Sequence, residues 1–475
     1  MPIQFDNSFA RLPPQFFSPQ LPTKVAAPKM VKYNEALADE LGIPNGDLTP
    51  NMLAGNDIPQ GATPIATAYS GHQFGGFSPH LGDGRAILLG EIITPKGTRF
   101  DLQLKGSGQT MFSRNGDGRA NIAAVIREYV VSEAMHALNI PTTRALAAVT
   151  TGDMVQRETA TPGAVLARVA SSHIRVGTFQ FHYARQDKAA LETLTDYVIN
   201  RHYPDADGPI EMLTQVIERQ AKLVAKWMGV GFIHGVMNTD NMSIAGETID
   251  YGPCAFMDAY HPETVFSSID RNGRYAFANQ PKIALWNLSQ LAQTLVPLVG
   301  EDAIPEIEAA LNRFDDTFAV AFNTVFNKKL GFKNPQPEDK PLIENLLKIM
   351  AESQIDFTLM FSSLTRIAHS GDASDTRALF EDPRSFDTWL AKWTERAQCE
   401  NPVTRGLSMQ AANPVYIPRN HRVEEVIQSA TAGDYTKFEK LMDVLAEPYN
   451  YHANYDAFEL PPKPEEQVHA TFCGT

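Results

Sequence analysis

The chain has 475 residues, of which 43% are hydrophobic, and its net charge at pH 7 is -14. This length and composition support a large core built from two packed parts. The acidic balance excludes a general nucleic-acid-binding surface, which needs a basic face to neutralise phosphates. Three scattered cysteines and the lack of an apolar run of about 20 residues predict a cytoplasmic protein without a disulfide framework or a membrane span.

The first part of the chain changes character near residue 60. Residues 1–60 are rich in proline and predict an extension wrapped on a core, with short helical pieces such as residues 31–41. Residues 61–170 begin with clustered glycines and predict a mixed lobe. Its expected elements are strands at 85–93 and 99–105 joined by a turn at 95–97, a helix at 122–138, and strands near 144–150 and 164–169. This order is typical of the small lobe of a protein kinase.

Residues 171–460 predict a mostly helical large lobe, and residues 461–475 a mobile tail. The expected elements are helical stretches at 210–228, 281–331, 341–368 and 423–444, with a short hairpin at 242–249. The predicted fold class is therefore α+β, a protein-kinase-like fold of two lobes with extensions at both ends.

The segment from His234 to Gly252 carries the clearest functional pattern. A kinase catalytic loop has the form H-R-D-x-x-x-x-N and is followed by D-F-G. Val236 stands where the base Asp is expected, whereas Asn241 and Asp250 match the two metal-holding positions. Their oxygens suit Mg²⁺ or Mn²⁺, although a polar turn is the alternative. The pattern indicates a dead kinase or a kinase fold that runs a different reaction on ATP.

Asp240 adjoins the expected metal ligands and offers a carboxylate that Val236 cannot supply. A carboxylate at this place can accept a proton from an incoming hydroxyl. A loop cap is the alternative role for Asp240.

Lys105 ends a predicted strand and points away from Leu102 and Leu104. The glycines that follow it allow backbone to approach a ligand closely. The pattern predicts a lysine that grips ATP phosphates, with a solvent-facing lysine as the alternative. Its partner carboxylate would come from the next helix, as either Glu128 or Glu133, and helical geometry does not choose between them.

Two copies of G-D-G-R, at residues 82–85 and 116–119, flank this lysine. Each places a backbone turn beside a cation, which suits an anion-binding nest, although Asp-Gly is also a common hairpin turn. Arg168 and Arg175 follow the last predicted strand of the small lobe. They either clamp phosphates or form structural ion pairs.

Seven motifs, in matching order and spacing over about residues 69–277, resemble the selenoprotein O family. The motifs are Y-S-G-H-Q-F-G (69–75), L-G-D-G-R (81–85), L-Q-L-K-G-S-G (102–108), G-D-G-R-A (116–120), I-R-E-Y-x-x-S-E-A-M (126–135), H-G-V-M-N-T-D-N-M (234–242) and I-D-Y-G-P-C-A-F-M-D (249–258).

The resemblance implies a kinase-like fold that binds ATP in a flipped orientation and transfers AMP to Ser, Thr or Tyr hydroxyls of proteins, with Mg²⁺ or Mn²⁺ as cofactor. UTP with Mn²⁺ remains open, and a γ-phosphate kinase and a nucleotide-binding pseudokinase scaffold are the alternative functions. By motif match, the family's residues are Asp240 as proton acceptor, Asn241 and Asp250 as metal ligands, Glu128 as the partner of Lys105, and Gly82, Gly84, Arg85, Lys105, Asp117, Gly118, Arg168, Arg175 and Asp250 as the ATP-binding set.

The cysteines depart from the family pattern. Family members carry selenocysteine or cysteine near the C-terminus, and here Cys473 stands there without a neighbouring thiol. Residues 266–277 contain no cysteine, which leaves Cys254 as the nearby candidate partner. A redox switch of the family type is therefore not expected. The sequence indicates neither the target proteins nor the oligomeric state.

Overall fold

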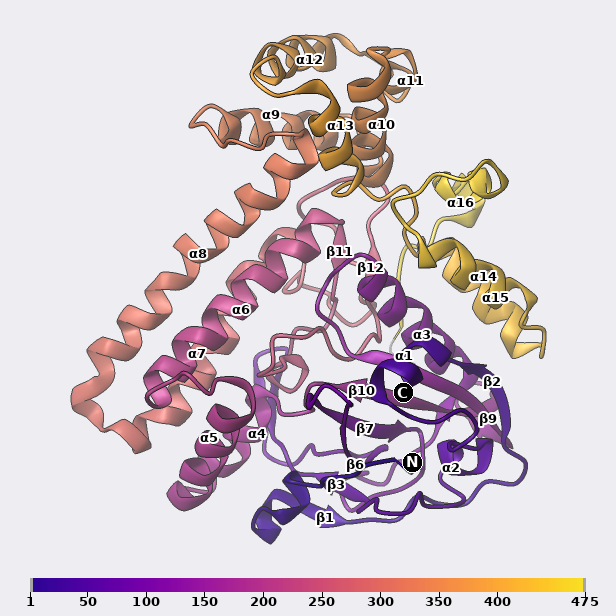
Figure 1. Cartoon of the computed structure of the whole chain (residues 1–475), viewed down its shortest axis with the longest axis vertical. Coiled ribbons are helices and arrows are strands. Elements are labelled where there is room, and N and C mark those ends of the chain that lie inside the picture. Colours follow the sequence, from indigo (N-terminus) through magenta and orange to yellow (C-terminus); the bar gives the residue numbers. More distant parts are fainter. Residues whose placement is uncertain (1–2, 473–475) are drawn as a thin grey trace.

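A computed structural model describes residues 3–472 of the chain and shows a mixed α/β architecture. An antiparallel sheet occupies one end of the molecule, and helices form the remainder (Figure 1). The α+β class predicted from the sequence is confirmed.

Within the described residues the main sheet has eight strands, and every pair in it is antiparallel. In spatial order its strands are β1 (Phe17–Pro19), β3 (Ile65–Thr67), β6 (Ala86–Ile93), β7 (Arg99–Lys105), β10 (Ala160–Ala170), β9 (Arg144–Gln156) and β2 (Lys29–Tyr33), with β8 (Ala120–Asn121) paired to β10. Two short ladders lie apart from it: β4 (Gly71–Gln73) with β5 (Gly76–Ser78), and β11 (Phe232–Ile233) with β12 (Ala255–Phe256).

The centre of the sheet explains where polar residues gather. The predicted strands at 85–93 and 99–105 are confirmed as β6 and β7, which pair with Ala86 opposite Lys105. Alternation along β7 sends Leu102 and Leu104 into an apolar cluster and Gln103 and Lys105 to the other face. That second face is also buried, because Gln103 is 0% and Lys105 9% exposed. A buried polar face requires partners for every charge on it.

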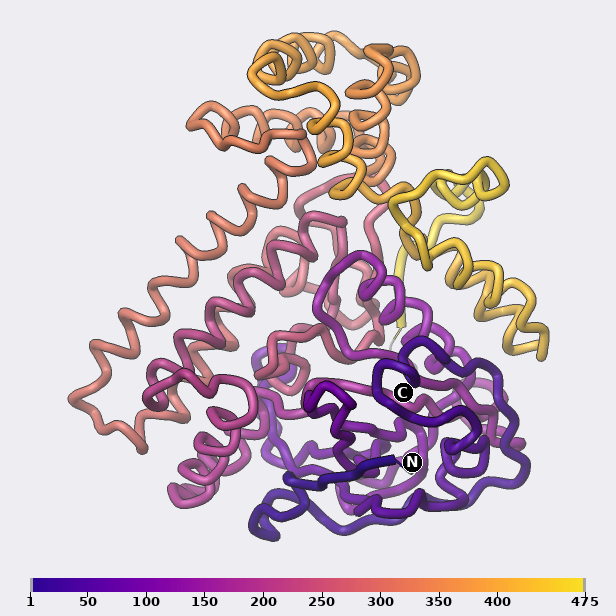
Figure 2. The backbone as a smooth tube through the Cα atoms, in the orientation of Figure 1, coloured from indigo at the N-terminus to yellow at the C-terminus, as the bar shows by residue number. Residues whose placement is uncertain are grey.

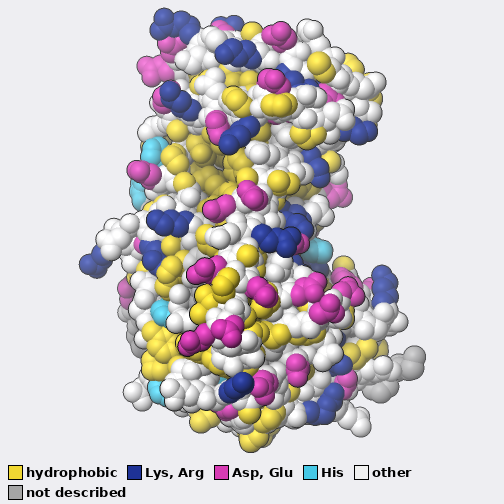
Figure 3. Space-filling model, turned by 90° about the vertical axis from the view of Figure 1, so that its left-hand side faces the viewer, with side chains coloured by type: hydrophobic (Ala, Val, Ile, Leu, Met, Phe, Trp, Pro, Cys, Tyr) yellow, Lys and Arg dark blue, Asp and Glu magenta, His cyan; other side chains and the backbone are white. Residues whose placement is uncertain are grey.

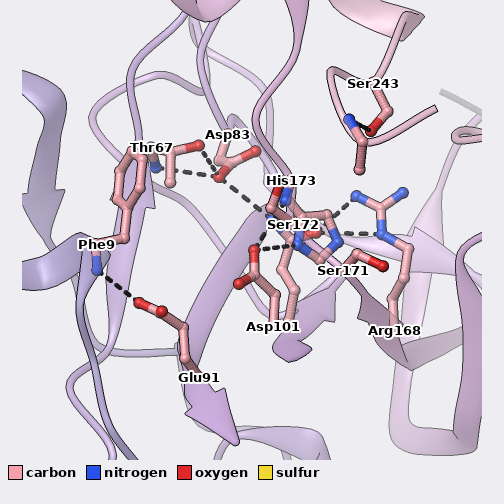
Figure 4. Close-up of polar contacts among 12 residues, drawn as sticks. Phe9, Thr67, Asp83, Glu91, Asp101, Arg168, Ser171, Ser172, His173 and Ser243 are labelled. Carbon is pink, nitrogen blue, oxygen red and sulfur yellow. Dashed lines mark hydrogen bonds and ion pairs between the residues drawn. The ribbon is translucent and has the colours of Figure 1, made fainter. Parts of the chain in front are cut away.

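The N-terminal segment adds strands to both edges of the sheet. Its predicted helix at 31–41 is wrong in its first half, where β2 pairs with β9. The helix α1 (Glu35–Leu41) begins only after Asn34, whose side chain accepts a hydrogen bond from the Leu37 amide. The non-local pair of β2 with β9 thus overrides the helical pattern. Nearer the chain start, the Phe9 amide donates to Glu91 on β6 at 2.6 Å (Figure 4).

The helices follow the predicted stretches but are more finely divided. They are α2 (Pro50–Ala54), α3 (Ile122–Ala137), α4 (Val176–Tyr183), α5 (Lys188–His202), α6 (Pro209–Gly229), α7 (Gln280–Val299), α8 (Ile304–Leu330), α9 (Asp339–Glu352), α10 (Phe357–Ser370), α11 (Ser374–Arg377), α12 (Arg384–Ala397), α13 (Pro402–Gln410), α14 (Asn420–Thr431), α15 (Thr436–Ala446) and α16 (Asp456–Glu459). The breaks at Gly300 and Gly433 carry positive φ angles of 86°, which glycine adopts without a steric penalty.

Segments far apart in sequence meet on α3. The tube in Figure 2 shows the C-terminal helices beside the sheet end of the molecule. Val423 and Val426 on α14 and Phe438 on α15 join the same apolar cluster as Tyr129 on α3. The rings of Tyr129 and Phe438 lie 5.5 Å apart. Helix α3 therefore packs between the sheet on one side and helices α14 and α15 on the other.

The predicted hairpin at 242–249 is wrong. Its turn forms, since the Gly246 amide donates to the Ser243 carbonyl. The two arms do not pair with each other: Ser243 bridges to Arg175, and Thr248 to Thr142. The arms instead join this loop to the segments on either side of it.

In the described part of the chain, no helix combines the length and the apolar character that crossing a bilayer requires. On the face shown in Figure 3, acidic and basic side chains are interspersed and no continuous basic area forms.

Candidate functional site

Four charged side chains meet between β7, β10, α3 and the turn after residue 249. Lys105 Nζ lies 2.6 Å from Glu128 Oε2 and also contacts Asp250 Oδ1. Arg168 Nη1 lies 3.1 Å from Glu128 and 3.3 Å from Asp250. Two cations and two carboxylates thus alternate in a cluster where Lys105, Glu128 and Arg168 are all buried. Pairing of this kind allows charges to remain in the interior.

The other glutamate of α3 lies elsewhere. Glu133 accepts hydrogen bonds from Arg144 at 2.9 and 2.8 Å and from the Ala145 amide at 2.9 Å. It therefore fixes α3 to the start of β9, whereas Glu128 is the carboxylate that meets Lys105.

Asp250 has an unusual backbone and a shifted acidity. Its φ angle of 67° lies in the left-handed region, which costs energy for a residue with a Cβ atom. Burial alone would raise the pKa of Asp250, but the charges of Lys105, Arg168 and Arg175 outweigh it and hold the pKa well below its ordinary value. Asp250 is therefore a carboxylate at all physiological pH values, as a ligand of a cation must be.

Arg175 is the N-cap residue of α4 and is 1% exposed. Its Nη1 donates to the Asp240 carbonyl at 3.1 Å, and its guanidinium lies 4.3 Å from the centre of the Tyr69 ring. Nη2 is buried without a hydrogen-bond partner in the described structure, and Asp83 Oδ1 lies 3.9 Å from it. A buried cation with an unused donor suits an anionic ligand.

Asp240 lies under the β4–β5 ladder. Gln73 Nε2 donates to Asp240 Oδ2 at 3.2 Å, and Oδ1 has no hydrogen-bond partner among the described residues. A Cβ atom on Gly71 would lie 2.7 Å from Oδ1, so a larger residue there would displace the Asp240 side chain. Burial raises the pKa of Asp240 to about 6, against the lowering effect of Arg175. A carboxylate with this acidity can take a proton near neutral pH.

Asn241 follows in the same 3₁₀ turn, which spans Thr239–Asn241. Its Nδ2 donates to the Val236 carbonyl at 3.0 Å, which fixes the amide and leaves Oδ1 as its acceptor atom. Asp250 receives Lys105 and Arg168 on Oδ1, which leaves Oδ2. The donor set is oxygen-only and includes one anion, which fits Mg²⁺ or Mn²⁺.

The two G-D-G-R turns and Asp250 line one pocket of about 480 Å³, a size suited to a small ligand. The residues around it are Tyr69, Gly82, Gly84, Arg85, Phe112, Ser113, Arg114, Gly116, Asp117, Gly118, Arg119, Arg157 and Asp250. Arg85 also lines a neighbouring cavity together with Lys105 and Glu128. Arg157 holds Asp117 at 2.8 Å and lowers its pKa. The chain thus brings both turns, which are distant in sequence, to one place beside the charged cluster.

Cys254 is buried, and Cys473 lies outside the described residues. The chain nearby is anchored, because Thr471 donates from its amide to Phe266 at 2.7 Å and from its hydroxyl to Pro253 at 2.6 Å.

Sequence reasoning missed two residues on the buried polar face. Gln103 lies between Asp83 and Arg168, and Asp83 points inward although the glycines on either side of it line the pocket. The polar alternation of β7 is the only sequence signal for Gln103. The turn pattern at residues 82–85 carries no information on the direction of Asp83.

Comparisons with known proteins show which family the chain belongs to. A family model described as "Protein adenylyltransferase SelO" matches residues 1–446. Curated proteins named "Protein nucleotidyltransferase YdiU" are similar over nearly their whole length. The one from Bradyrhizobium sp. (strain ORS 278) is 56% identical over 485 residues, with 99% of each chain covered. The one from Rhodopseudomonas palustris (strain BisB18) is 54% identical over 485 residues with the same coverage. The one from Ruegeria pomeroyi is 54% identical over 477 residues, covering 100% of this chain and 99% of the relative. The chain belongs to the SelO family of protein adenylyltransferases.

Proposed function

We propose that this chain transfers AMP from ATP to Ser, Thr or Tyr hydroxyls of proteins, on a kinase-like fold of two lobes. Residues 61–170 would form the small lobe and residues 171–460 the large lobe, with residues 1–60 and 461–475 as extensions. We further propose that it acts in the cytoplasm, because three scattered cysteines are too few for a disulfide framework.

One observation carries the proposal: the G-D-G-R turns, Arg85 and Asp250 line a common pocket next to the Lys105–Glu128 ion pair. Glycines let the backbone approach a nucleotide closely, and the cations beside them suit a triphosphate. In the flipped orientation that we propose, the β- and γ-phosphates face Lys105, Arg168 and Arg175. The α-phosphate then faces the side of Asp240.

The reaction that follows is a single displacement. Asp240 would take the proton of the acceptor hydroxyl as its oxygen attacks the α-phosphorus. The bond from the α-phosphorus to the bridging oxygen breaks, and pyrophosphate leaves. The charge that develops on pyrophosphate would face Lys105, Arg168 and Arg175, which are already fixed by Glu128 and by the backbone. Preorganised cations need no rearrangement during the step.

A divalent cation, Mg²⁺ or Mn²⁺, would be held by Asn241 and Asp250 and would neutralise phosphate charge when bound. The oxygen donors described above fit such an ion. A UTP substrate with Mn²⁺ remains a second nucleotide to test in the same pocket.

Label transfer from ATP tests the proposal. The purified chain is incubated with a protein acceptor, Mg²⁺ or Mn²⁺, and ATP labelled at either the α- or the γ-phosphate. Label from the α position alone, lost in Asp240→Asn, is the expected result. Label from the γ position alone would make the protein a kinase. Binding of ATP with no transfer from either position would identify a scaffold and refute the proposal.

A further inference from the structure

Asp83 is a buried carboxylate inside a nucleotide-binding turn. It is 2% exposed, although Gly82 and Gly84 on either side of it line the pocket. Its Oδ2 accepts hydrogen bonds from the Thr67 amide at 3.0 Å and from the Thr67 hydroxyl at 2.5 Å (Figure 4). Strand β3 thus fixes the orientation of the carboxylate, which does not face the pocket.

A first connection runs from Asp83 through Gln103 to Arg168. Gln103 Nε2 donates to Asp83 Oδ2 at 3.3 Å, and Gln103 Oε1 accepts from Arg168 Nη2 at 2.6 Å and Nε at 3.2 Å. A carboxylate accepts and a guanidinium donates, so the amide between them has only one workable orientation. With Nε and Nη2 occupied in this way, Arg168 Nη1 is the nitrogen that faces Glu128 and Asp250.

A second connection runs directly from Asp83 to Arg175. Asp83 Oδ1 lies 3.9 Å from Arg175 Nη2, the nitrogen that has no hydrogen-bond partner among the described residues. One oxygen of the carboxylate therefore lies near Arg175, and the other contacts Gln103, which binds Arg168. The proposed function assigns both arginines to the phosphates. Each arginine is at most 3% exposed, so neither can satisfy its charge with water.

We infer that Asp83 is a positioning residue, which holds Arg168 through Gln103 and Arg175 directly and so sets the phosphate-binding geometry before the nucleotide enters. The inference deepens the proposed function and depends on it. Coulomb repulsion alone gives the opposite expectation, because a carboxylate beside a triphosphate site repels the ligand. Two opposite outcomes can therefore be distinguished by experiment.

The test compares binding of ATP and of adenosine by calorimetry in the wild type and in Asp83→Asn, which keeps the shape and removes the charge. Positioning predicts that ATP binds about tenfold more weakly in Asp83→Asn, since the negative charge that faces Gln103 and lies 3.9 Å from Arg175 is lost, while adenosine binding stays unchanged. Unchanged or tighter ATP binding in Asp83→Asn would overturn the inference, because it would show that Asp83 acts only as a nearby negative charge.

Two further variants serve as a second test and as a control. Gln103→Met breaks only the connection to Arg168, and we expect weaker ATP binding with adenosine unaffected, even if Asp83→Asn does not fold. Thr67→Val removes one of the two Thr67 hydrogen bonds to the same carboxylate and leaves the Thr67 amide, Gln103 and both arginines in place, and we expect a smaller loss of ATP affinity than in Asp83→Asn. A loss in Thr67→Val equal to that in Asp83→Asn would assign the effect to the turn and overturn the inference. Failure of wild type to bind ATP would instead refute the proposed function.

Discussion

Glu247→Gln is expected to stabilise the protein at alkaline pH and to leave it nearly unchanged at acid pH. Glu247 stands between Asn241 and Asp250 in the sequence. Its carboxyl accepts hydrogen bonds from the Ser171 amide at 3.1 Å and the Ser171 hydroxyl at 2.5 Å. Burial raises the pKa of Glu247 from 4.5 to about 7, which outweighs the lowering effect of the two Ser171 hydrogen bonds.

The sign of the pH effect follows from this shift. Below pH 4.5 both folded and unfolded chains hold the proton, and stability is unaffected. Between pH 4.5 and about 7 the unfolded chain loses its proton while the folded chain keeps it, so stability falls as pH rises. Above about 7 the loss is complete. The full shift corresponds to about 3 kcal/mol. Part of the Glu247 surface is exposed, and we therefore expect about 1–2 kcal/mol after solvent screening.

Glutamine keeps one acceptor for Ser171 and cannot ionise. Urea unfolding at about pH 4.5 and about pH 8, followed by tryptophan fluorescence, should show Glu247→Gln more stable than wild type only at the higher pH. Glu344→Gln, whose side chain is 64% exposed, serves as the matched control and should change little at either pH. Equal destabilisation of Glu247→Gln at both pH values would show that the effect of the substitution does not depend on ionisation of Glu247, and would refute the reasoning.

The remaining predictions concern the charged cluster. Asp240→Asn should lower AMP transfer by about a hundredfold or more while ATP still binds, as measured by label transfer and calorimetry; full activity would exclude Asp240 as the proton acceptor. Asp250→Asn should abolish transfer, and a chelator should do the same to wild type, with recovery on adding Mn²⁺; activity that survives the chelator would contradict the metal assignment. Glu128→Gln leaves Lys105 and Arg168 with one carboxylate between them and should lower the free energy of unfolding by about 3 kcal/mol. Glu133→Gln, in contrast, should weaken the ion pair to Arg144 and leave the KM for ATP unchanged.

Local pattern was sufficient for much of the fold. Strands β6 and β7 and helix α3 follow from alternation and helical periodicity within short windows. Strand β2 could not be predicted, because its partner β9 lies more than a hundred residues away and the local sequence favours helix. The long helical stretch at 281–331 hides a break, since a glycine within a periodic segment is compatible with both a continuous helix and a turn.

The site shows the same division. The motifs located Lys105, Asp240 and Asp250, because the types and spacing of these residues are tied to chemistry. The choice of Glu128 over Glu133 depends on how α3 is rotated against the sheet, which packing of α14 and α15 helps to determine. The inward direction of Asp83 depends on Thr67, a contact between strands that no local pattern records.

The contacts of Thr471 connect the segment after Asp250 to a distant part of the chain. Thr471 donates hydrogen bonds to Pro253 and Phe266, and 218 residues separate it from Pro253. The arrangement around Pro253 therefore forms only after segments far apart in sequence have come together. A proteolytic cut between these segments would leave the arrangement held by noncovalent contacts alone.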